Sequence, residues 1–439
     1  MIRVFFKLVL HFRLFGILLI ALLLFQFFNQ NTSAGNSVLI ITPHPDDEVL
    51  STGGHIARFV KQGDQVYVVA LTAGEGFTFD IYLKKKTITP NFNDFIKYGE
   101  NRINELNQSL EMLGIKKDNV FVLGFPDGGL DFLWLTHWEE TFKSQITSQT
   151  STFYENSFLP NTPFKGKNIN LQLQQIIKLI RPTKIFIVDT LDIHNDHWPT
   201  YCFAIITILD IMTKNNDFCP EIYTYPIHFQ KYPNSKGYKK DNKLTPTMEM
   251  KRYNSTYQEY PINHNEMLLK EKAIRNYNSQ FLLMENLLVS FIRKNEVFGR
   301  PIKYKFDDFK NYEFDDSSID VSSHYRNTSA NIKSVAVSRD KNYLNITLNT
   351  NGRINKNYNY FLRLNIFFDD RFERHDISYH DKKSMINIIE HEKSIIFELS
   401  LDYLESARYL FFGMDTNSYP QVRNARAFID RTHYFILEL

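Results

Sequence analysis

The sequence predicts an α/β protein: a doubly wound, mostly parallel sheet, with an N-terminal membrane segment and a C-terminal all-β sandwich domain. Three observations carry this prediction. Apolar runs of strand length alternate with helical periodicity between residues 37 and 300. An uncharged apolar run stands near the N-terminus, and short alternating segments separated by turns follow residue 306. The first pattern is typical of βαβ units and the last of an antiparallel sandwich.

Five apolar runs have the length of buried strands. They cover residues 37–41, 66–71, 120–123, 184–188 and 221–227. Helical periodicity is found at residues 50–61, 95–113, 171–180, 199–212 and 266–288. Gly63 and Gly114 directly follow two of these helices and are expected to end them. Strands separated by helices form parallel units, so we expect a Rossmann-like sheet.

The N-terminal apolar run indicates a membrane segment. Residues 14–28 carry no charge, whereas Arg3, Lys7 and Arg13 precede them. The positive-inside rule then places the N-terminus in the cytoplasm and the rest of the chain outside it. We expect residues 1–34 to be a transmembrane anchor. Cleavage as a signal peptide near residues 32–34, with secretion of the protein, is the alternative.

Charge and cysteine content exclude two classes of protein. The chain has 51 Lys and Arg against 49 Asp and Glu among 439 residues. This near-neutral balance argues against a nucleic-acid partner. The two cysteines, Cys202 and Cys219, are too few for a multi-cysteine zinc site, and whether they pair is left open. The length fits two domains, which we expect at residues 35–305 and 306–439.

Two clusters of metal-binding side chains follow predicted strands. His44, Asp46 and Asp47 come directly after the first strand, and residues 192–197 (Asp-Ile-His-Asn-Asp-His) come after the fourth. The carboxyl ends of parallel strands share one edge of a sheet, so the clusters can converge. Histidine and carboxylate ligands without thiolates suit zinc or another divalent first-row metal. Three protein ligands would leave a position open for catalysis.

Each cluster also has a simpler interpretation. Asp46 or Asp47 is equally suited to cap the helix that begins near Val49, and the spacing alone does not decide which of the two binds a metal. His55 lies within a helical pattern and is expected to be structural. Other histidines without a partner at ligand spacing are excluded from the site: His137, His228, His264 and those after His324.

These motifs resemble those of a known family. Residues 43–48 (Pro-His-Pro-Asp-Asp-Glu) and 194–197 (His-Asn-Asp-His) resemble the two signatures of the zinc-dependent N-acetylglucosaminyl deacetylases called the PIG-L or LmbE-like family. Further landmarks occur in the same order: residues 72–76, Arg102 with Glu105, residues 124–128, and Lys272-Ala273 followed by Ser279-Gln280. The resemblance covers residues 37 to 300 and neither terminal part.

The resemblance implies a role for each matching residue. The implied zinc ligands are His44, Asp47 and His197, with Asp46 as the general base. His194 is similar to an imidazole that polarises the substrate carbonyl or protonates the leaving amine. Arg102 is similar to a substrate-binding arginine. The residues expected to hold the side chains of this site in position are Glu48, Glu105 and Asp127.

The resemblance also implies an activity. We expect Zn²⁺-dependent removal of the N-acetyl group from an N-acetylglucosamine-type sugar, on a polymeric glycan or a lipid-linked one, by metal-activated water. A metal-dependent amidohydrolase acting on a non-sugar amide is one alternative. A surface protein that binds glycans without catalysis is the other, although the complete set of ligand positions argues against it.

The C-terminal part has no diagnostic motif. Its strand Asn342-Tyr-Leu-Asn-Ile-Thr-Leu348 resembles those of β-sandwiches attached to extracellular carbohydrate-active enzymes, which makes carbohydrate binding a candidate role. Aromatic residues in alternating strands more often form a core than a sugar-binding face. We expect a chain truncated near Arg300 to keep its activity on a small acetamido sugar and to lose affinity for polymer.

Overall fold

The computed structural model describes residues 35–77, 79, 81–82, 89–306, 311–315, 327–381, 386–419 and 428–439. Within it, Ser37–Leu439 forms one compact unit. The predicted membrane segment, residues 1–34, lies outside the described residues. Among the described residues, no helix is long and apolar enough to span a bilayer.

The central sheet has the predicted parallel architecture. Its five strands are β1 (Ser37–Thr42), β2 (Gln65–Thr72), β3 (Val120–Phe125), β4 (Lys184–Val188) and β5 (Glu221–Tyr225). They are arranged in the order β3-β2-β1-β4-β5, and every neighbouring pair is parallel. The chain order reverses between β1 and β4. In doubly wound sheets this switch point opens a crevice at the carboxyl ends of the strands.

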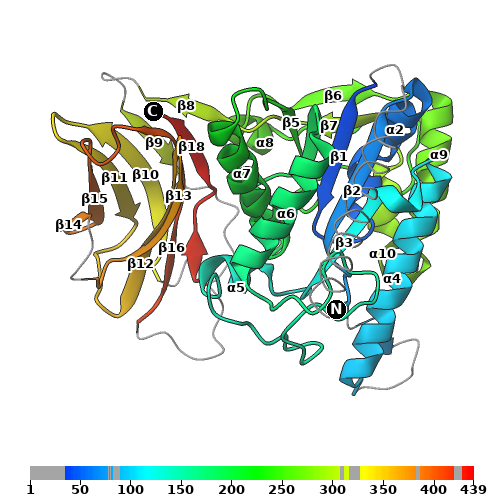
Figure 1. The fold of residues 1–439 in the computed structure, drawn as a ribbon, viewed down its shortest axis with the longest axis horizontal. Coiled ribbons are helices and arrows are strands. Elements are labelled where there is room, and N and C mark those ends of the chain that lie inside the picture. The colour runs from blue at the N-terminus through cyan, green and yellow to red at the C-terminus, as the bar shows by residue number, and fades with distance from the viewer. Residues whose placement is uncertain are drawn as a thin grey trace, which may run out of the picture. The chain divides into compact units, whose positions relative to one another are not determined.

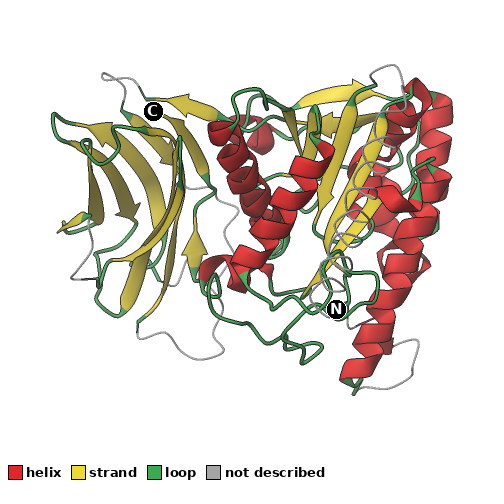
Figure 2. Ribbon diagram, in the orientation of Figure 1, coloured by secondary structure: helices red, strands yellow, loops and turns green. Residues whose placement is uncertain are grey.

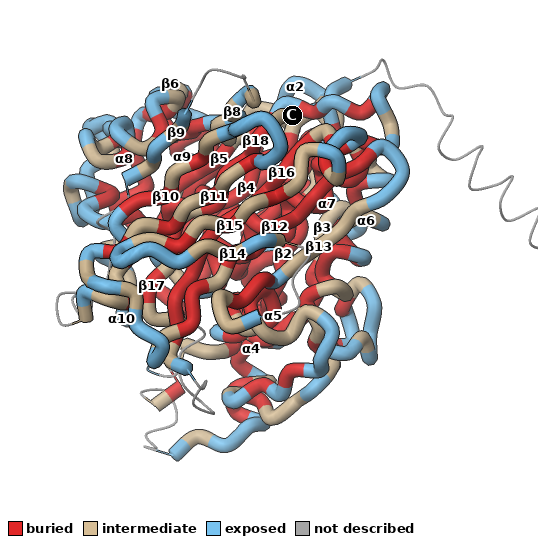
Figure 3. Tube along the Cα trace, turned by 90° about the vertical axis from the view of Figure 1, so that its left-hand side faces the viewer, coloured by how far each residue is buried: buried red, intermediate tan, exposed pale blue. Residues whose placement is uncertain are grey.

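Helices cover both faces of the sheet (Figure 1). One face carries α2 (Asp47–Gln62), α4 (Phe92–Met112) and α9 (His264–Arg275), and the other carries α6 (Gly166–Ile180) and α7 (His197–Lys214). Side chains alternate along β1, so that Val38 and Ile40 enter the first core and Leu39 and Ile41 the second. Burial on both faces explains why the strands are continuous apolar runs (Figure 3).

The predicted helix over residues 266–288 is wrong, because the structure has two helices there. α9 ends at Arg275, and α10 (Asn278–Leu288) begins three residues later. Between them Tyr277 leaves the helical conformation, with φ −77° and ψ 63°. Its buried hydroxyl donates to Glu48 at the mouth of the sheet. The remaining short elements are α5 (Leu130–Leu135), α8 (Met248–Tyr253), η1 (Lys117–Asn119), η2 (Val289–Phe291), β6 (Gln258–Pro261) and β7 (Asn295–Phe298).

The C-terminal part is a sandwich of two sheets built from strands alone (Figure 2). One sheet has the order β14-β15-β11-β10-β9 and the other β13-β12-β16-β18-β8, with β17 paired to β16. The strands are β8 (Lys303–Lys305), β9 (Tyr312–Asp315), β10 (Ile332–Arg339), β11 (Tyr343–Thr350), β12 (Tyr358–Phe368), β13 (Phe372–Ser378), β14 (Asn387–Glu390), β15 (Ser394–Ser400), β16 (Ala407–Ser418), β17 (Asp430–Arg431) and β18 (Phe435–Glu438). The first of them lies just ahead of the predicted boundary.

The sandwich shares a hydrophobic core with the α/β part. Phe411 and Tyr434 of the sandwich belong to the same buried cluster as Trp134 and Phe203 of the helical layer. The indole nitrogen of Trp134 donates to the hydroxyl of Tyr434 at 2.6 Å. Arg363 of β12 donates to the carbonyl at the end of α5, at Leu135, over 3.0 Å. Because this core is continuous, the sandwich is packed against the layer that carries α7.

Candidate metal centre

The two predicted clusters meet at the switch point of the sheet. His44 lies two residues beyond the end of β1, and Asp47 is the first residue of α2. His197 is the first residue of α7, which follows β4 after a loop. Because β1 and β4 are neighbouring parallel strands, both loops leave the same edge of the sheet.

Three ligand atoms form a nearly equilateral triangle. Nδ1 of His44 lies 3.2 Å from Oδ2 of Asp47 and 3.2 Å from Nε2 of His197. The third side, from Nε2 of His197 to Oδ2 of Asp47, is 3.3 Å. All three residues are buried. In a tetrahedral zinc site with bonds of about 2.0 Å, ligand atoms stand about 3.3 Å apart. The triangle therefore has the dimensions of one face of such a site.

The outer nitrogens of both imidazoles face carboxylates. Nε2 of His44 lies 3.2 Å from Asp127 and 3.1 Å from Asp196. Nδ1 of His197 lies 3.0 Å from Asp192. A neutral imidazole that donates its outer N–H to a carboxylate presents a lone pair on the inner nitrogen. With both rings neutral, the three atoms of the triangle would all be acceptors, and a cation between them would satisfy all three.

Electrostatics also draw positive charge into this cluster. Burial opposes protonation of His197, yet Asp192 and Asp47 outweigh burial and raise its pKa to about 9. Burial likewise opposes ionisation of Asp47, but His197 and His44 hold its pKa well below the ordinary value. The negative charge of the carboxylates is thus greater than neutral imidazoles can balance. Such an excess is expected where a divalent cation binds.

Asp46 stands beside the triangle in an unusual backbone conformation. Its φ of 115° is rare for a residue other than glycine. Its backbone N–H donates to Glu48 at 3.0 Å, and Glu48 in turn accepts the hydroxyl of Tyr277. Arg102 donates to the carboxylate of Asp46 at 3.0 Å and to the carbonyl of Gly74 at 2.9 Å. Burial raises the pKa of Asp46 to about 7, against the opposing charge of Arg102.

His194 lies against both imidazoles of the triangle and groups with them at ligand spacing. Its ring centroid is 4.8 Å from that of His44 and 4.7 Å from that of His197. Nδ1 of His194 accepts the backbone N–H of Asp196 at 3.2 Å. Nε2 therefore carries the proton of the neutral ring and is available as a donor. Burial, with the neighbouring His197 and His44, keeps the pKa of His194 well below its ordinary value.

The predicted supporting residues occupy different positions. Glu48 holds the backbone of Asp46, and Asp127 faces His44 while accepting the N–H of Gly76 at 2.7 Å. Glu105 accepts from the backbone of Ser279 at 2.9 Å and joins α4 to α10. Arg102 reaches the site, where it also donates to the carbonyl of Pro45. The assigned catalytic, ligand and substrate-binding roles stay predictions.

Three residues at the site were not assigned from the sequence. Asp192 and Asp196 lie within the second cluster and face the imidazoles of His197 and His44. His228, which the sequence analysis leaves out, also lies here and groups with Asp47 and His197 at ligand spacing. Its ring centroid is 4.9 Å from that of His197. His228 follows β5, so the rule of strand ends that found the two clusters also identifies it.

His55 is structural, as predicted. Its ring donates to Glu296, which also accepts the N–H of Gly54 at 2.8 Å and the ammonium of Lys270 at 2.7 Å. Lys270 lies in α9 and Glu296 in β7, so these hydrogen bonds join α2 to two neighbouring elements. Cys202 is buried and Cys219 exposed, and both are free thiols.

Comparison with known proteins identifies the part of the chain that builds this centre. A family model described as PIG-L: GlcNAc-PI de-N-acetylase matches residues 39–208. A 1D-myo-inositol 2-acetamido-2-deoxy-alpha-D-glucopyranoside deacetylase of Corynebacterium glutamicum is 35% identical over 92 residues, which are 20% of this chain and 29% of that protein. The enzyme of the same name from Rhodococcus jostii is 34% identical over 101 residues, 21% of this chain and 32% of the relative.

The chain thus spans less than a third of the length of these relatives. Among solved structures, N,N'-diacetylchitobiose deacetylase from Pyrococcus horikoshii is similar with a TM-score of 0.37 and 20% identity, over 60% of this chain and 82% of that one. The range that the family model matches, residues 39–208, contains both loops that carry the atoms of the triangle. Residues 39–208 form a PIG-L domain.

Proposed function

We propose that this protein is a zinc-dependent N-deacetylase that removes the acetyl group from an N-acetylglucosamine-type sugar. The triangle of His44, Asp47 and His197 carries the proposal, because its sides of 3.2 to 3.3 Å match a zinc coordination face. Three protein ligands leave one position open to water or substrate. The two imidazoles and one carboxylate are a donor set that suits zinc.

The residues around the triangle supply the remaining chemistry. Zinc, when bound, polarises the acetamide carbonyl and lowers the pKa of water. Asp46, fixed by Arg102 and by its strained backbone, is placed to accept the proton of the attacking water. The Nε2 proton of His194 is placed to be donated to the departing amine or to the acetamide oxygen as charge develops there. Asp192 and Asp196 hold the ligand imidazoles in the required tautomers.

The names of the relatives support the substrate class. The two curated relatives are deacetylases of a 2-acetamido-2-deoxyglucopyranoside by name. They match only a short part of this chain, so the group attached to the sugar, whether glycan or lipid, is open to experiment. A metal-dependent amidohydrolase acting on a non-sugar amide would use the same centre.

Acetate release tests this proposal. The full chain with added Zn²⁺ is assayed on free, lipid-linked and polymeric N-acetylhexosamines, in parallel with Asp46→Asn. A matched control is Asp210→Asn, because Asp210 is a buried aspartate of α7 that is paired with Gln174 and Lys214. We expect acetate from at least one sugar, a loss of about 100-fold or more in Asp46→Asn, and wild-type turnover in the control. Equal turnover in Asp46→Asn contradicts the proposal, and turnover confined to non-sugar amides supports the alternative substrate class.

We also propose that residues 1–34 anchor the protein in a membrane, with the catalytic part outside the cytoplasm. The uncharged run at residues 14–28, preceded by basic residues, supports this. The full chain is expected to stay in the membrane fraction after an alkaline carbonate wash, whereas residues 37–439 are not. Recovery of a soluble chain that begins near residue 35 would instead show cleavage.

A further inference from the structure

One arginine of the C-terminal sandwich reaches the loop that presents the metal ligands. Arg431, in β17, donates from Nη2 to the carbonyl oxygen of Asp192 at 3.1 Å. Its guanidinium carbon also lies 4.5 Å from the ring centroid of Trp198, the residue after His197. A single side chain therefore contacts both ends of the segment that runs from Asp192 to α7.

Arg431 is itself held in place by the sandwich. In the antiparallel ladder its backbone stands opposite that of Asp415 in β16, and the backbone of the neighbouring Asp430 stands opposite that of Thr416. Asp430 is fully buried and accepts the backbone N–H of Ile332 at 2.7 Å. The arginine is thus anchored in a sheet that lies outside the PIG-L domain at residues 39–208.

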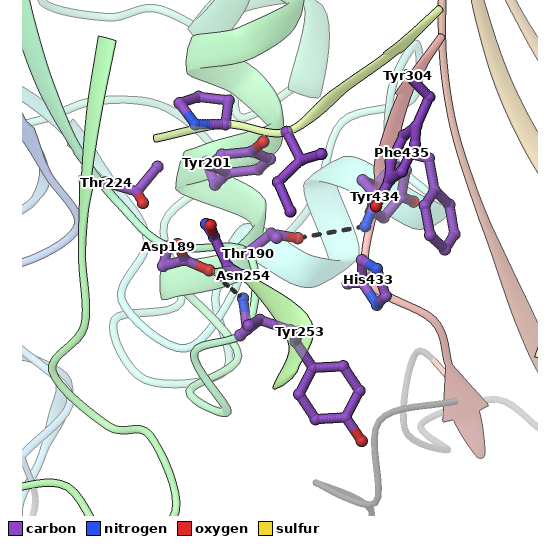
Figure 4. Close-up of a pocket in the computed structure, with 13 residues that line it drawn as sticks. Asp189, Thr190, Tyr201, Thr224, Tyr253, Asn254, Tyr304, His433, Tyr434 and Phe435 are labelled. Carbon is purple, nitrogen blue, oxygen red and sulfur yellow. Dashed lines mark hydrogen bonds between the residues drawn. The ribbon is translucent and has the colours of Figure 1, made fainter. Parts of the chain in front are cut away.

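A second contact between the sandwich and this loop lies close by. The backbone N–H of Tyr434 donates to the hydroxyl of Thr190 at 3.3 Å, and Figure 4 shows the two residues facing each other. The ring of Tyr434 stacks on Trp198 with an interplanar angle of 11°. The cavity between these segments is small, about 30 Å³, and is lined by residues of both parts, among them Asp189 and His433. The sandwich therefore contacts this loop at Thr190 and Asp192, and it contacts the start of α7 at Trp198.

The same loop determines the positions of two imidazoles. The carboxylate of Asp192 accepts from Nδ1 of His197 at 3.0 Å and from the backbone N–H of His194 at 3.0 Å. It also accepts the backbone N–H of His228 at 2.8 Å. Arg431 holds Asp192 by its carbonyl, while the carboxylate of Asp192 orients His197. The chain of contacts runs from sandwich to ligand in two steps.

We propose that Arg431 is a positioning residue for the metal centre and that the sandwich is part of the active-site scaffold. This inference rests on the proposed function, because it assumes a cation between His44, Asp47 and His197. Arg431 acts through Asp192 and Trp198. Without the guanidinium the loop loses its fixed point, and His197 loses the orientation that a tetrahedral ligand needs.

Metal affinity measures this role directly. Zn²⁺ dissociation constants are determined by chelator competition for the full chain and for Arg431→Met, Arg431→Lys and Arg408→Met. Arg408 is the matched control: it is also a sandwich arginine that donates to a backbone carbonyl of the α/β part, at Thr213 over 3.3 Å, but at the far end of α7. The visible absorption of the Co²⁺-loaded proteins reports ligand geometry independently of catalysis.

We expect Arg431→Met to weaken Zn²⁺ binding about tenfold and to shift the Co²⁺ absorption. Arg431→Lys, which keeps a cation over Trp198, recovers part of the loss, and Arg408→Met binds as the wild type does. Wild-type affinity and spectrum in Arg431→Met overturn the inference, as does an equal loss in Arg408→Met. If circular dichroism shows that Arg431→Met does not fold, the Zn²⁺ affinity and the Co²⁺ spectrum of Arg431→Lys test the inference instead. A wild-type protein that binds no Zn²⁺ overturns the proposed function itself.

Discussion

Nδ1 of His44 and Nε2 of His197 lie 3.2 Å apart, although 153 positions separate the two residues in the sequence. The distance follows from the strand order. β1 and β4 are neighbours at the point where the strand order reverses; His44 stands just beyond β1, and His197 begins α7 after the loop that follows β4. Because both outer nitrogens face carboxylates, neutral rings would direct their inner nitrogens at one shared cation.

Replacing Asp196 by Asn should weaken metal binding without unfolding the protein. One oxygen of Asp196 faces His44, and its carboxylate also accepts the N–H groups of Gly128 at 2.7 Å and Leu130 at 2.9 Å. The amide keeps one acceptor but removes one of the two negative charges, those of Asp196 and Asp127, that face Nε2 of His44. We expect Zn²⁺ affinity to fall about 10- to 100-fold. Asp210→Asn, within the helix that Asp196 precedes, is the control; equal affinities in the two variants would contradict the role of Asp196.

Gly74→Ala should impair catalysis while leaving metal binding intact. Gly74 has φ 64°, and a Cβ there would overlap the guanidinium of Arg102. Displacing Arg102 breaks its hydrogen bond to Asp46 but touches none of the three ligands. We expect turnover to fall at least about tenfold, as for a mispositioned base, with unchanged Zn²⁺ affinity.

The control for Gly74→Ala is Gly63→Ala. Gly63 also has a positive φ, of 86°, but an added Cβ meets nothing within 4 Å. Both variants lose about 1 kcal/mol to backbone strain, so a difference in turnover between them isolates the contact with Arg102. Equal turnover in the two variants would show that Arg102 does not position Asp46.

The buried carboxylate of Glu296 should make stability depend on pH in the acid range. Burial raises the pKa of Glu296, but Lys270 and His55 outweigh it and lower the pKa to about 2. The folded-state pKa lies below the unfolded value of about 4.3. By linkage, the ionised carboxylate therefore contributes about 3 kcal/mol to the free energy of unfolding. This contribution is complete when the pH is above the unfolded-state pKa, and it is lost as the pH falls toward 2.

Urea unfolding of wild type and Glu296→Gln between pH 7 and pH 3 tests this dependence. The difference in unfolding free energy is expected to be largest near neutrality and to shrink below pH 4. Glu139→Gln removes an exposed ion pair with Lys167 and should change stability little at any pH. A difference between wild type and Glu296→Gln that does not change with pH would show that the carboxylate is not ionised in the folded protein.

Removal of the sandwich should destabilise the α/β part. Truncation near Arg300 exposes the core residues that pack on Phe411 and Tyr434, among them Trp134 and Phe203. We therefore predict that residues 37–300 are insoluble or lack cooperative unfolding, contrary to the expectation of an active truncated enzyme that the sequence raised. Size-exclusion chromatography and thermal unfolding check this. A soluble monomer with wild-type turnover on a small acetamido sugar would restore the independent-module interpretation.

Much of the fold is predictable because its signals are local. β1 and β2 are buried on both faces and read as continuous apolar runs, while Gly63 ends α2 with φ 86°. The sequence does not predict the break between α9 and α10, because apolar periodicity continues through Tyr277. That residue leaves the helix where its hydroxyl reaches Glu48, a contact 229 positions away that no local pattern encodes.

The candidate site also has a part that the sequence predicts and a part that only the structure shows. His44, Asp47 and His197 stand at strand ends in short motifs, so their convergence follows from the sheet topology. Asp192 and Asp196 belong to the motif at residues 192–197, but the sequence does not assign them a role. Only the fold shows which imidazole each one faces. Arg431 lies 239 positions from Asp192 in a part of the chain without motifs, so its contact is visible only in the structure.

Metal content tests the central claim most directly. Zinc is measured by mass spectrometry in the purified full chain and in His197→Gln, after dialysis against a weak chelator and reloading with Zn²⁺. Because the three atoms of the triangle are spaced to hold one zinc ion, we expect about one zinc per chain in the wild type and a stoichiometry close to zero in the variant. A wild-type protein without zinc, or equal zinc content in the two proteins, would contradict the assignment of His44, Asp47 and His197 as ligands.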